Sequence, residues 1–161
     1  MWIIQSKYGT QEFYQSLEKE LASLIDGEKN LIANLANLSS WLFHALPELN
    51  WAGFYLWDEA DQELVLGPFQ GMPACIRIRP QRGVCGKAYT TGATLKVDDV
   101  EAFPGHIACD SASKSELVIP LKKNGKVFGL LDLDSPKLAR FTEEDAVELT
   151  RIMKAISEKI F

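Results

Sequence analysis

The 161-residue chain has an ordinary globular composition, with 47% hydrophobic and 24% charged residues and a net charge of −5. Its acidic balance and scattered lysines and arginines disfavour nucleic acid as a partner, and no apolar run approaches the roughly 20 residues of a membrane span. The first residues lack the pattern of a signal peptide. Three cysteines in a chain that needs no disulfides indicate a reducing, cytoplasmic setting in which thiols serve chemistry or packing.

Apolar residues at helical spacing predict two amphipathic helices within about 10–46. A glycine at position 27 separates them, and Pro47 and Asn50 end the second. The residues that carry the periodicity are Phe13, Leu17, Leu21 and Ile25 in the first helix, and Leu31, Leu35, Leu38, Leu42 and Leu46 in the second.

A change of period predicts a sheet and its site loops over about 50–135. The aromatic stretch WAGFYLW is typical of a strand, and ELVLGPF completes a hairpin with it. CIRIRP predicts a third strand, in which Ile76 and Ile78 alternate with arginines. GVCG indicates a short helix, and TLKVDD follows as a short strand.

Asn124-Gly125, between ELVIPL and KVFGLLDLD, is the strongest hairpin signal in the chain. Thr142 then occupies an N-cap position before acidic residues, which predicts a C-terminal helix over about 142–160. Together the elements predict an α+β fold, in which N- and C-terminal helices flank an antiparallel sheet of about six strands. Residues 1–161 are expected to form a single domain.

Three carboxylates are expected on one face of the last hairpin. Asp132 and Asp134 alternate along a strand, so they project from the same side. A three-residue loop over 123–125 gives the register that adds Glu116 to them and keeps the other face apolar. Such a patch fits a solvated sheet edge, or a site for a metal or an ammonium group.

The aromatic strand offers a similar choice, because Trp51, Gly53, Tyr55 and Trp57 lie on one face. Core packing is the commoner role of such a face. The alternative is that Trp51 and Tyr55 form the walls of a small pocket in which Gly53 leaves room.

The three thiols, Cys75, Cys85 and Cys109, include no C-x-x-C pair. With His106 they would be able to form a zinc site, but the spacings match no usual framework, so no metal is expected. Cys75 fits a small buried residue. Cys85 lies at an expected helix N-terminus, where the dipole favours the thiolate.

Cys109 lies in a loop of about twenty residues that also carries Phe103 and Ile107. Structureless loops of this length are usually functional in compact domains. We therefore expect the loop to pack over a site as a lid.

Several of these stretches form one set of motifs: NWAGFYL, LGPFQG, CIRI, GVCG, GHIACDSASKSE, GLLDLDS and RFTEED, with GEKNLIANLANLSS before them. The set covers nearly the whole chain from Asn50 onward. It resembles the GAF family, and more closely the free methionine-(R)-sulfoxide reductases within it. Generic GAF domains share the fold without these three cysteines.

The resemblance implies a cytoplasmic enzyme that reduces the R-sulfoxide of free methionine. Thioredoxin would regenerate it, with NADPH as the electron source through thioredoxin reductase and with no bound cofactor. A homodimer is implied as well. By motif, Cys109 is the catalytic thiol, Cys75 its disulfide partner and Cys85 an auxiliary thiol; which of the latter two resolves the sulfenic acid first stays open.

The same motifs imply the substrate-binding residues. Glu116, Asp132 and Asp134 match the acids that bind substrate and handle protons, and Trp51 and Tyr55 match the aromatics around the substrate's methyl group. Two other functions stay open beside the enzyme: a non-catalytic GAF sensor of a small ligand, and a redox switch whose thiols pair without a substrate.

Overall fold

The computed structural model describes residues 3–107 and 109–161. Its long helices are α1 (Gln11–Leu24), α2 (Leu31–Ala45) and α4 (Glu143–Ile160). The side chain of the residue before each helix caps its N-terminus. These N-cap residues are Thr10, Asn30 and Thr142, short polar residues of the kind that favour this position. None of the helices in this part of the chain has the length and apolar character of a membrane span.

An antiparallel sheet of six strands, in the order β3-β2-β1-β6-β5-β4, forms the centre of the fold. A short helix, α3 (Gly83–Thr91), and a 3-10 turn, η1 (Val100–Ala102), complete the elements. The predicted α+β architecture is confirmed. The strands are β1 (Trp51–Asp58), β2 (Glu63–Gly71), β3 (Arg77–Ile78), β4 (Leu95–Val97), β5 (Ser115–Lys123) and β6 (Lys126–Ser135).

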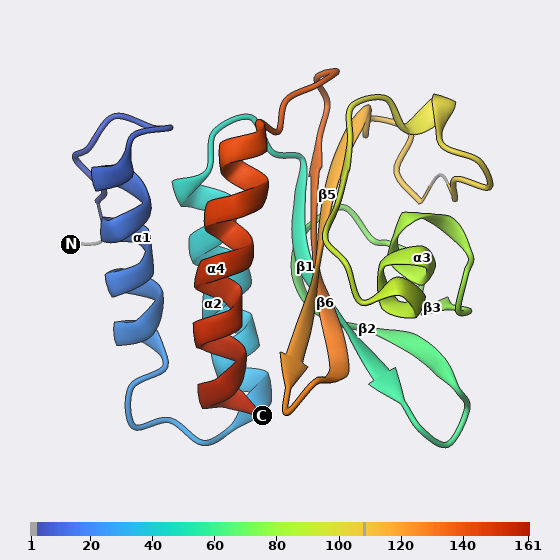
Figure 1. Ribbon diagram of the computed structural model, residues 1–161, viewed down its shortest axis with the longest axis horizontal. Coiled ribbons are helices and arrows are strands. Elements are labelled where there is room, and N and C mark those ends of the chain that lie inside the picture. The colour runs from blue at the N-terminus through green and yellow to red at the C-terminus, as the bar shows by residue number, and fades with distance from the viewer. Residues whose placement is uncertain (1–2, 108) are drawn as a thin grey trace.

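The sheet separates two layers that differ in character (Figure 1). On one face α2 and α4 lie against the strands, and α1 lies outside them as a further layer. On the other face lie α3 and the long loop that follows β4 (Figure 1). The alternation of side chains along each strand therefore presents successive residues to different layers.

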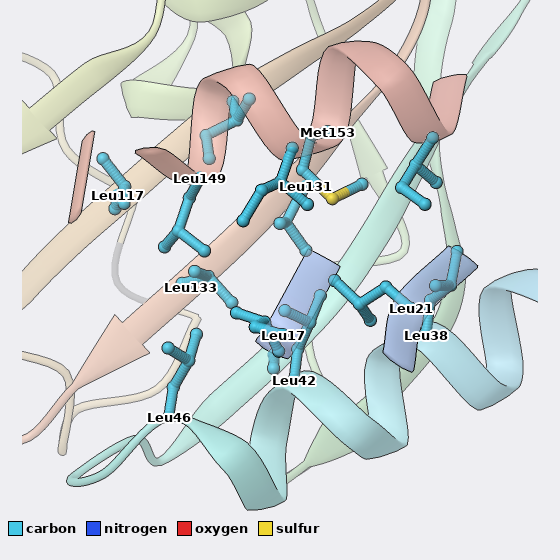
Figure 2. Packing of buried hydrophobic residues seen from close by; sticks show 14 of the residues in the cluster. Leu17, Leu21, Leu38, Leu42, Leu46, Leu117, Leu131, Leu133, Leu149 and Met153 are labelled. Carbon is cyan, nitrogen blue, oxygen red and sulfur yellow. The ribbon is translucent and has the colours of Figure 1, made fainter. Parts of the chain in front are cut away.

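The larger core fills the space between the helices and the sheet. Leu17 and Leu21 of α1 meet α2 and α4, and the strands contribute Leu131 and Leu133 (Figure 2). All four side chains are fully buried. A second, smaller cluster lies on the opposite face and includes Trp51 and Tyr55.

In the last hairpin, the side chains lie on the predicted faces, but the loop and the register differ from the prediction. Lys123 pairs with Lys126, so the loop has two residues, and Asn124 and Gly125 both adopt positive φ. A bulge next to Gly129 then shifts the register by one. The predicted three-residue loop was therefore wrong, but the predicted shared face is confirmed, since Glu116 lies opposite Asp134.

The third strand is shorter than predicted. The strand covers only Arg77 and Ile78, although the Ile76 carbonyl also accepts a hydrogen bond from β2; Ile76 is 69% exposed, whereas Ile78 is buried. Ile76 precedes the paired residues, so the expected alternation of two inward isoleucines is wrong. This leaves residues 72–76 as an irregular segment with Cys75 inside it.

Candidate active site

A pocket of about 520 Å³, counted with the space open to solvent, lies between the sheet and the long loop. Strands β1, β5 and β6 form its floor, and α3 and the loop form its walls. The pocket brings together residues that are far apart in the sequence, among them Trp51, Tyr55, Cys85, Cys109, Glu116, Asp132 and Asp134.

The acids share this floor because of the sheet register. Glu116 of β5 pairs with Asp134 of β6, and Asp132 pairs with Gly53 of β1. Glu116 and Asp132 are only 6% and 7% exposed. The solvated sheet edge is therefore excluded as their setting, because the carboxyl groups are removed from water.

Burial raises the pKa of every acid in this group. Burial raises the pKa of Asp132 to about 6, and hydrogen bonding to Glu116 and Cys85 limits the rise. The pKa of Glu116 rises well above its usual range through burial and the nearby Asp132 and Asp134. Burial and Asp132 raise the pKa of Asp134 in the same direction. The cluster therefore holds protons at neutral pH.

Asp132 also has an unused acceptor. Its Oδ1 atom is buried and has no hydrogen-bond partner among the residues that the structure describes. An orphaned carboxylate oxygen in a pocket is costly unless a ligand supplies a donor. The pocket floor is thus built to receive a donor group, and a cationic donor would also offset its charge.

Cys85 lies in the first turn of α3 and faces the acids. Its Sγ donates a hydrogen bond to Glu116 Oε1 at 3.8 Å. Burial, followed by Asp132 and Glu116, raises the pKa of the thiol well above its usual range. The expectation of a thiolate was therefore wrong, because burial and the carboxylates outweigh the dipole of a short helix.

Cys75 and Cys109 are joined by a disulfide, with a Cα–Cα distance of 5.6 Å. The resemblance implied this pair, and the bond crosses a sequence separation of 34 residues. It connects the irregular segment before β3 to the long loop. With two of the three thiols bonded to each other, they are not available together with His106 as zinc ligands in this disulfide form.

A family model described as GAF domain matches residues 33–160. The chain belongs to the GAF family. It is similar to the free methionine-R-sulfoxide reductase of Escherichia coli (strain K12), with 46% identity covering 91% of this chain and 88% of that protein. The matching branch of the family is therefore the one that the cysteine motifs indicated.

Solved structures agree with the fold of this GAF domain. A free methionine-R-sulfoxide reductase from Neisseria meningitidis, in complex with its substrate, is 42% identical, with a TM-score of 0.90 over 99% of this chain and 95% of that one. A putative GAF sensor protein from Burkholderia vietnamiensis is 49% identical, with a TM-score of 0.88 over 92% of this chain and 94% of that one.

The aromatic wall of the GAF pocket differs from the prediction in one respect. Trp51 and Tyr55 line the pocket, and their rings stack with centroids 6.0 Å apart. A Cβ added at Gly53, however, would lie 2.3 Å from Phe69 Cβ and 2.6 Å from the Trp51 ring. Gly53 therefore makes room for the indole of Trp51 itself.

The long loop covers the pocket, as a lid would. His106 and Ile107 line the cavity from this side, and Ile107 packs against Gly83 at the start of α3. Ala108, next to the disulfide, lies outside the described residues. Opening and closing of the loop stay a prediction.

Sequence reasoning missed the role of Asn50. Its Nδ2 donates hydrogen bonds to Asp110 Oδ2 at 3.1 Å and to Ser113 Oγ at 3.0 Å, so it holds the Cys109 loop. The residue had been interpreted only as the end of a helical run. Its position directly before an aromatic strand was the available signal.

Two of the acids on the pocket floor also form a possible metal-ligand group with Cys85. Ligand atoms of Cys85, Glu116 and Asp132 all lie within 4.8 Å of one another. Asp132, which carries the orphaned oxygen, is one of the three. Grouped acceptors of this kind suit a metal ion or an ammonium group, and an ammonium group would also supply directional hydrogen bonds.

Proposed function

We propose that this GAF protein reduces free methionine-(R)-sulfoxide to methionine. The observation that carries the proposal is the Cys75–Cys109 disulfide beside a pocket with three acids on its floor. A thiol pair at the pocket supplies two electrons, and the acids supply charge and protons. Relatives named free methionine-R-sulfoxide reductase, at 46% and 40% identity, support the same activity.

The acids give the site its preference for a free amino acid. The substrate's ammonium group would donate to Asp132 Oδ1 and to Glu116 or Asp134, and its charge would favour their ionised forms. A methionine inside a polypeptide has no such ammonium group. Trp51 and Tyr55 would contact the apolar methyl group at the other end of the substrate.

Reduction begins at Cys109 in the dithiol form of the protein. Its sulfur attacks the sulfoxide sulfur, and a protonated acid of the cluster, with Asp134 as the candidate, protonates the oxygen. The S–O bond to methionine breaks, and the oxygen passes to Cys109 as a sulfenic acid. Methionine leaves reduced by two electrons, and the cysteine sulfur is oxidised by two.

The second stage protects and resets the thiol. Cys75 condenses with the sulfenic acid to give the disulfide and water, before further oxidation occurs. A thioredoxin dithiol then reduces the disulfide, with NADPH as the final electron source, so the protein needs no bound cofactor. Cys85 stays hydrogen-bonded to Glu116 as an auxiliary thiol.

A coupled assay tests the proposal. NADPH consumption with thioredoxin and thioredoxin reductase is measured with the R- and S-sulfoxides of free methionine, and with N-acetylmethionine sulfoxide. We expect turnover with the free R-isomer alone, and a loss of at least 1,000-fold in Cys109→Ser, because removal of a nucleophile costs about this much or more. Turnover that survives in Cys109→Ser would falsify the role of this thiol.

A small-ligand sensor is the second candidate, because a 49% identical structure is described as a putative GAF sensor protein. The pocket and its acids serve a bound amino acid equally well without chemistry. Calorimetry distinguishes the two: methionine sulfoxide that binds to the reduced protein and is recovered unreduced supports the sensor. The same result argues against the enzyme.

A further inference from the structure

The segment that carries Cys75 has no regular structure, and only Ala74 and Cys75 of it pack against the smaller cluster. Residues 72–76 connect β2 to β3 without regular structure, and Met72 and Ile76 are 65% and 69% exposed. Next to Cys75, the backbone carbonyl of Ile76 accepts a hydrogen bond from the Leu66 N–H of β2 at 2.8 Å. Cys75 is half-buried against the smaller cluster, whereas the exposed residues around it depend on hydrogen bonds for their position.

Two side chains of β1 hold this segment from below. The Tyr55 hydroxyl donates to the backbone carbonyl of Cys75 at 2.8 Å, and Trp51 Nε1 donates to the carbonyl of Met72 at 3.0 Å. Both side chains are buried and fixed in the sheet. The two bonds therefore attach both ends of the 72–75 segment to the most central part of the fold.

The hydroxyl of Tyr55 is suited to act as a permanent donor. Burial, followed by the negative charge of Asp132, raises its pKa well above the ordinary value for tyrosine. The group therefore stays protonated across the pH range in which the thiols react. Its direction is set by stacking of the ring on Trp51.

The strand also holds the opposite half of the disulfide. Asn50, directly before β1, donates hydrogen bonds to Asp110 and Ser113, which both follow Cys109 in the same loop. One continuous stretch, residues 50–55, thus contacts both segments that carry the paired sulfurs. Their separation is then fixed through a single rigid element.

We propose that Tyr55, with Trp51, is a positioning residue that holds Cys75 ready for disulfide formation. This role rests on the proposed function and goes beyond contact with the substrate's methyl group. In the step concerned, the Cys75 sulfur bonds to the Cys109 sulfur and the S–O bond of the sulfenic acid breaks. The oxygen leaves as water with the proton of the Cys75 thiol, so atoms and electrons balance.

A redox equilibrium tests the proposal without any substrate. Reduced and oxidised protein are equilibrated with dithiothreitol buffers, and the effective concentration of the Cys75–Cys109 pair is measured for wild type and Tyr55→Phe. We expect a fall of about fivefold in the variant, the effect of one neutral hydrogen bond lost from a preorganised segment. The variant retains the ring, so the pocket wall is kept.

Tyr89→Phe is the matched control. Tyr89 stacks on Trp57 with centroids 4.1 Å apart and lies on α3, away from residues 72–75. In this variant, the effective concentration of the Cys75–Cys109 pair should equal that of wild type. An unchanged value in Tyr55→Phe, or an equal fall in both variants, overturns the proposal. Hydrogen exchange at residues 74–76 of the reduced protein should rise only in Tyr55→Phe.

Single-turnover kinetics provide the second measurement. After one equivalent of methionine sulfoxide, disulfide formation in Tyr55→Phe should slow about fivefold more than methionine release, and dimedone should label more Cys109 sulfenic acid. Equal slowing of both steps contradicts a positioning role. If wild type releases no methionine, the proposed function fails, whereas the dithiothreitol equilibrium still decides the role of Tyr55.

Discussion

The carboxyl groups on the pocket floor destabilise the empty protein at neutral pH. Asp132 has its pKa raised from 3.8 to about 6 by burial, so the folded protein holds this proton more tightly than the unfolded chain. By linkage, the free energy of unfolding falls as pH rises from about 4 to about 6. The buried carboxylate thus lowers the free energy of unfolding, and a cationic ligand bound to it would raise that free energy again.

Asp132→Asn removes this cost. We expect the free energy of unfolding at pH 7 to rise by about 1–3 kcal/mol, because a shift of one pKa unit corresponds to about 1.4 kcal/mol. The gain should largely disappear at pH 3, where the wild-type carboxyl is mostly protonated in both states. Urea unfolding at the two pH values measures the difference.

Asp26→Asn is the control for this prediction, because Asp26 is exposed at the end of the first helical region. It should leave the pH dependence of stability unchanged. An Asp132→Asn protein that is less stable than wild type at pH 7 contradicts the account. Binding of free methionine sulfoxide should weaken in Asp132→Asn even though the protein is more stable.

At the scale of elements, the close contact of β1 with β6 determines where the site lies. A Cβ added at Gly129 would lie 2.4 Å from the backbone oxygen of Tyr55, so only glycine allows the strands to meet here. The bulge next to Gly129 sets the register that places Glu116 and Asp132 on the pocket side. The positions of the acids on β5 and β6 and of the aromatic residues on β1 thus depend on the contact between Gly129 and the Tyr55 backbone.

Gly129→Ala is expected to force the two strands apart. The free energy of unfolding should fall by about 2 kcal/mol or more, as overpacking against backbone cannot be relieved by a rotamer change. Gly67→Ala is the comparison, because its Cβ would lie 3.1 Å from the Phe54 oxygen. Urea unfolding should show the smaller loss there; an equal or larger loss in Gly67→Ala argues against the contact at Gly129.

Sequence patterns predicted what depends on periodicity. Helical spacing located α1, α2 and α4, and period-two alternation put Asp132 and Asp134 on one face. The bulge was not predictable, because the Asn124-Gly125 sequence fits both a two-residue loop followed by a bulge and a three-residue loop. The contacts of Asn50 and Gly53 depend on side chains that arrive from distant elements, and the Cys75–Cys109 pair came from resemblance.

At the scale of the whole molecule, a buried charged group attaches α1 to the rest of the fold. Asp145 of α4 accepts hydrogen bonds from the hydroxyls of Tyr8 and Tyr14 and forms an ion pair with Arg140 at 3.1 Å. The Arg140 Nε also donates to the Pro47 carbonyl at 2.8 Å. The N-terminal segment, α2 and α4 are therefore joined at one point.

Asp145→Asn breaks this group and leaves Arg140 as a buried, uncompensated charge. We expect the free energy of unfolding to fall by about 3–5 kcal/mol, the usual effect of removing one partner of a buried ion pair. Glu143→Gln, an exposed acid in the same helical turn, should change it by less than about 0.5 kcal/mol. Similar losses in the two variants, measured by urea unfolding, count against the network.

A single sheet divides the two layers, so successive side chains along β6 point to opposite faces of it. Leu131 and Leu133 anchor the helical layer, whereas Asp132 and Asp134 face the pocket. A substitution at a pocket-facing position of β6 therefore changes the pocket without changing the core between the sheet and the helices. Insertions or deletions in the middle of this strand exchange the two sets at once, so evolution of the site is confined to changes of residue type at constant strand length.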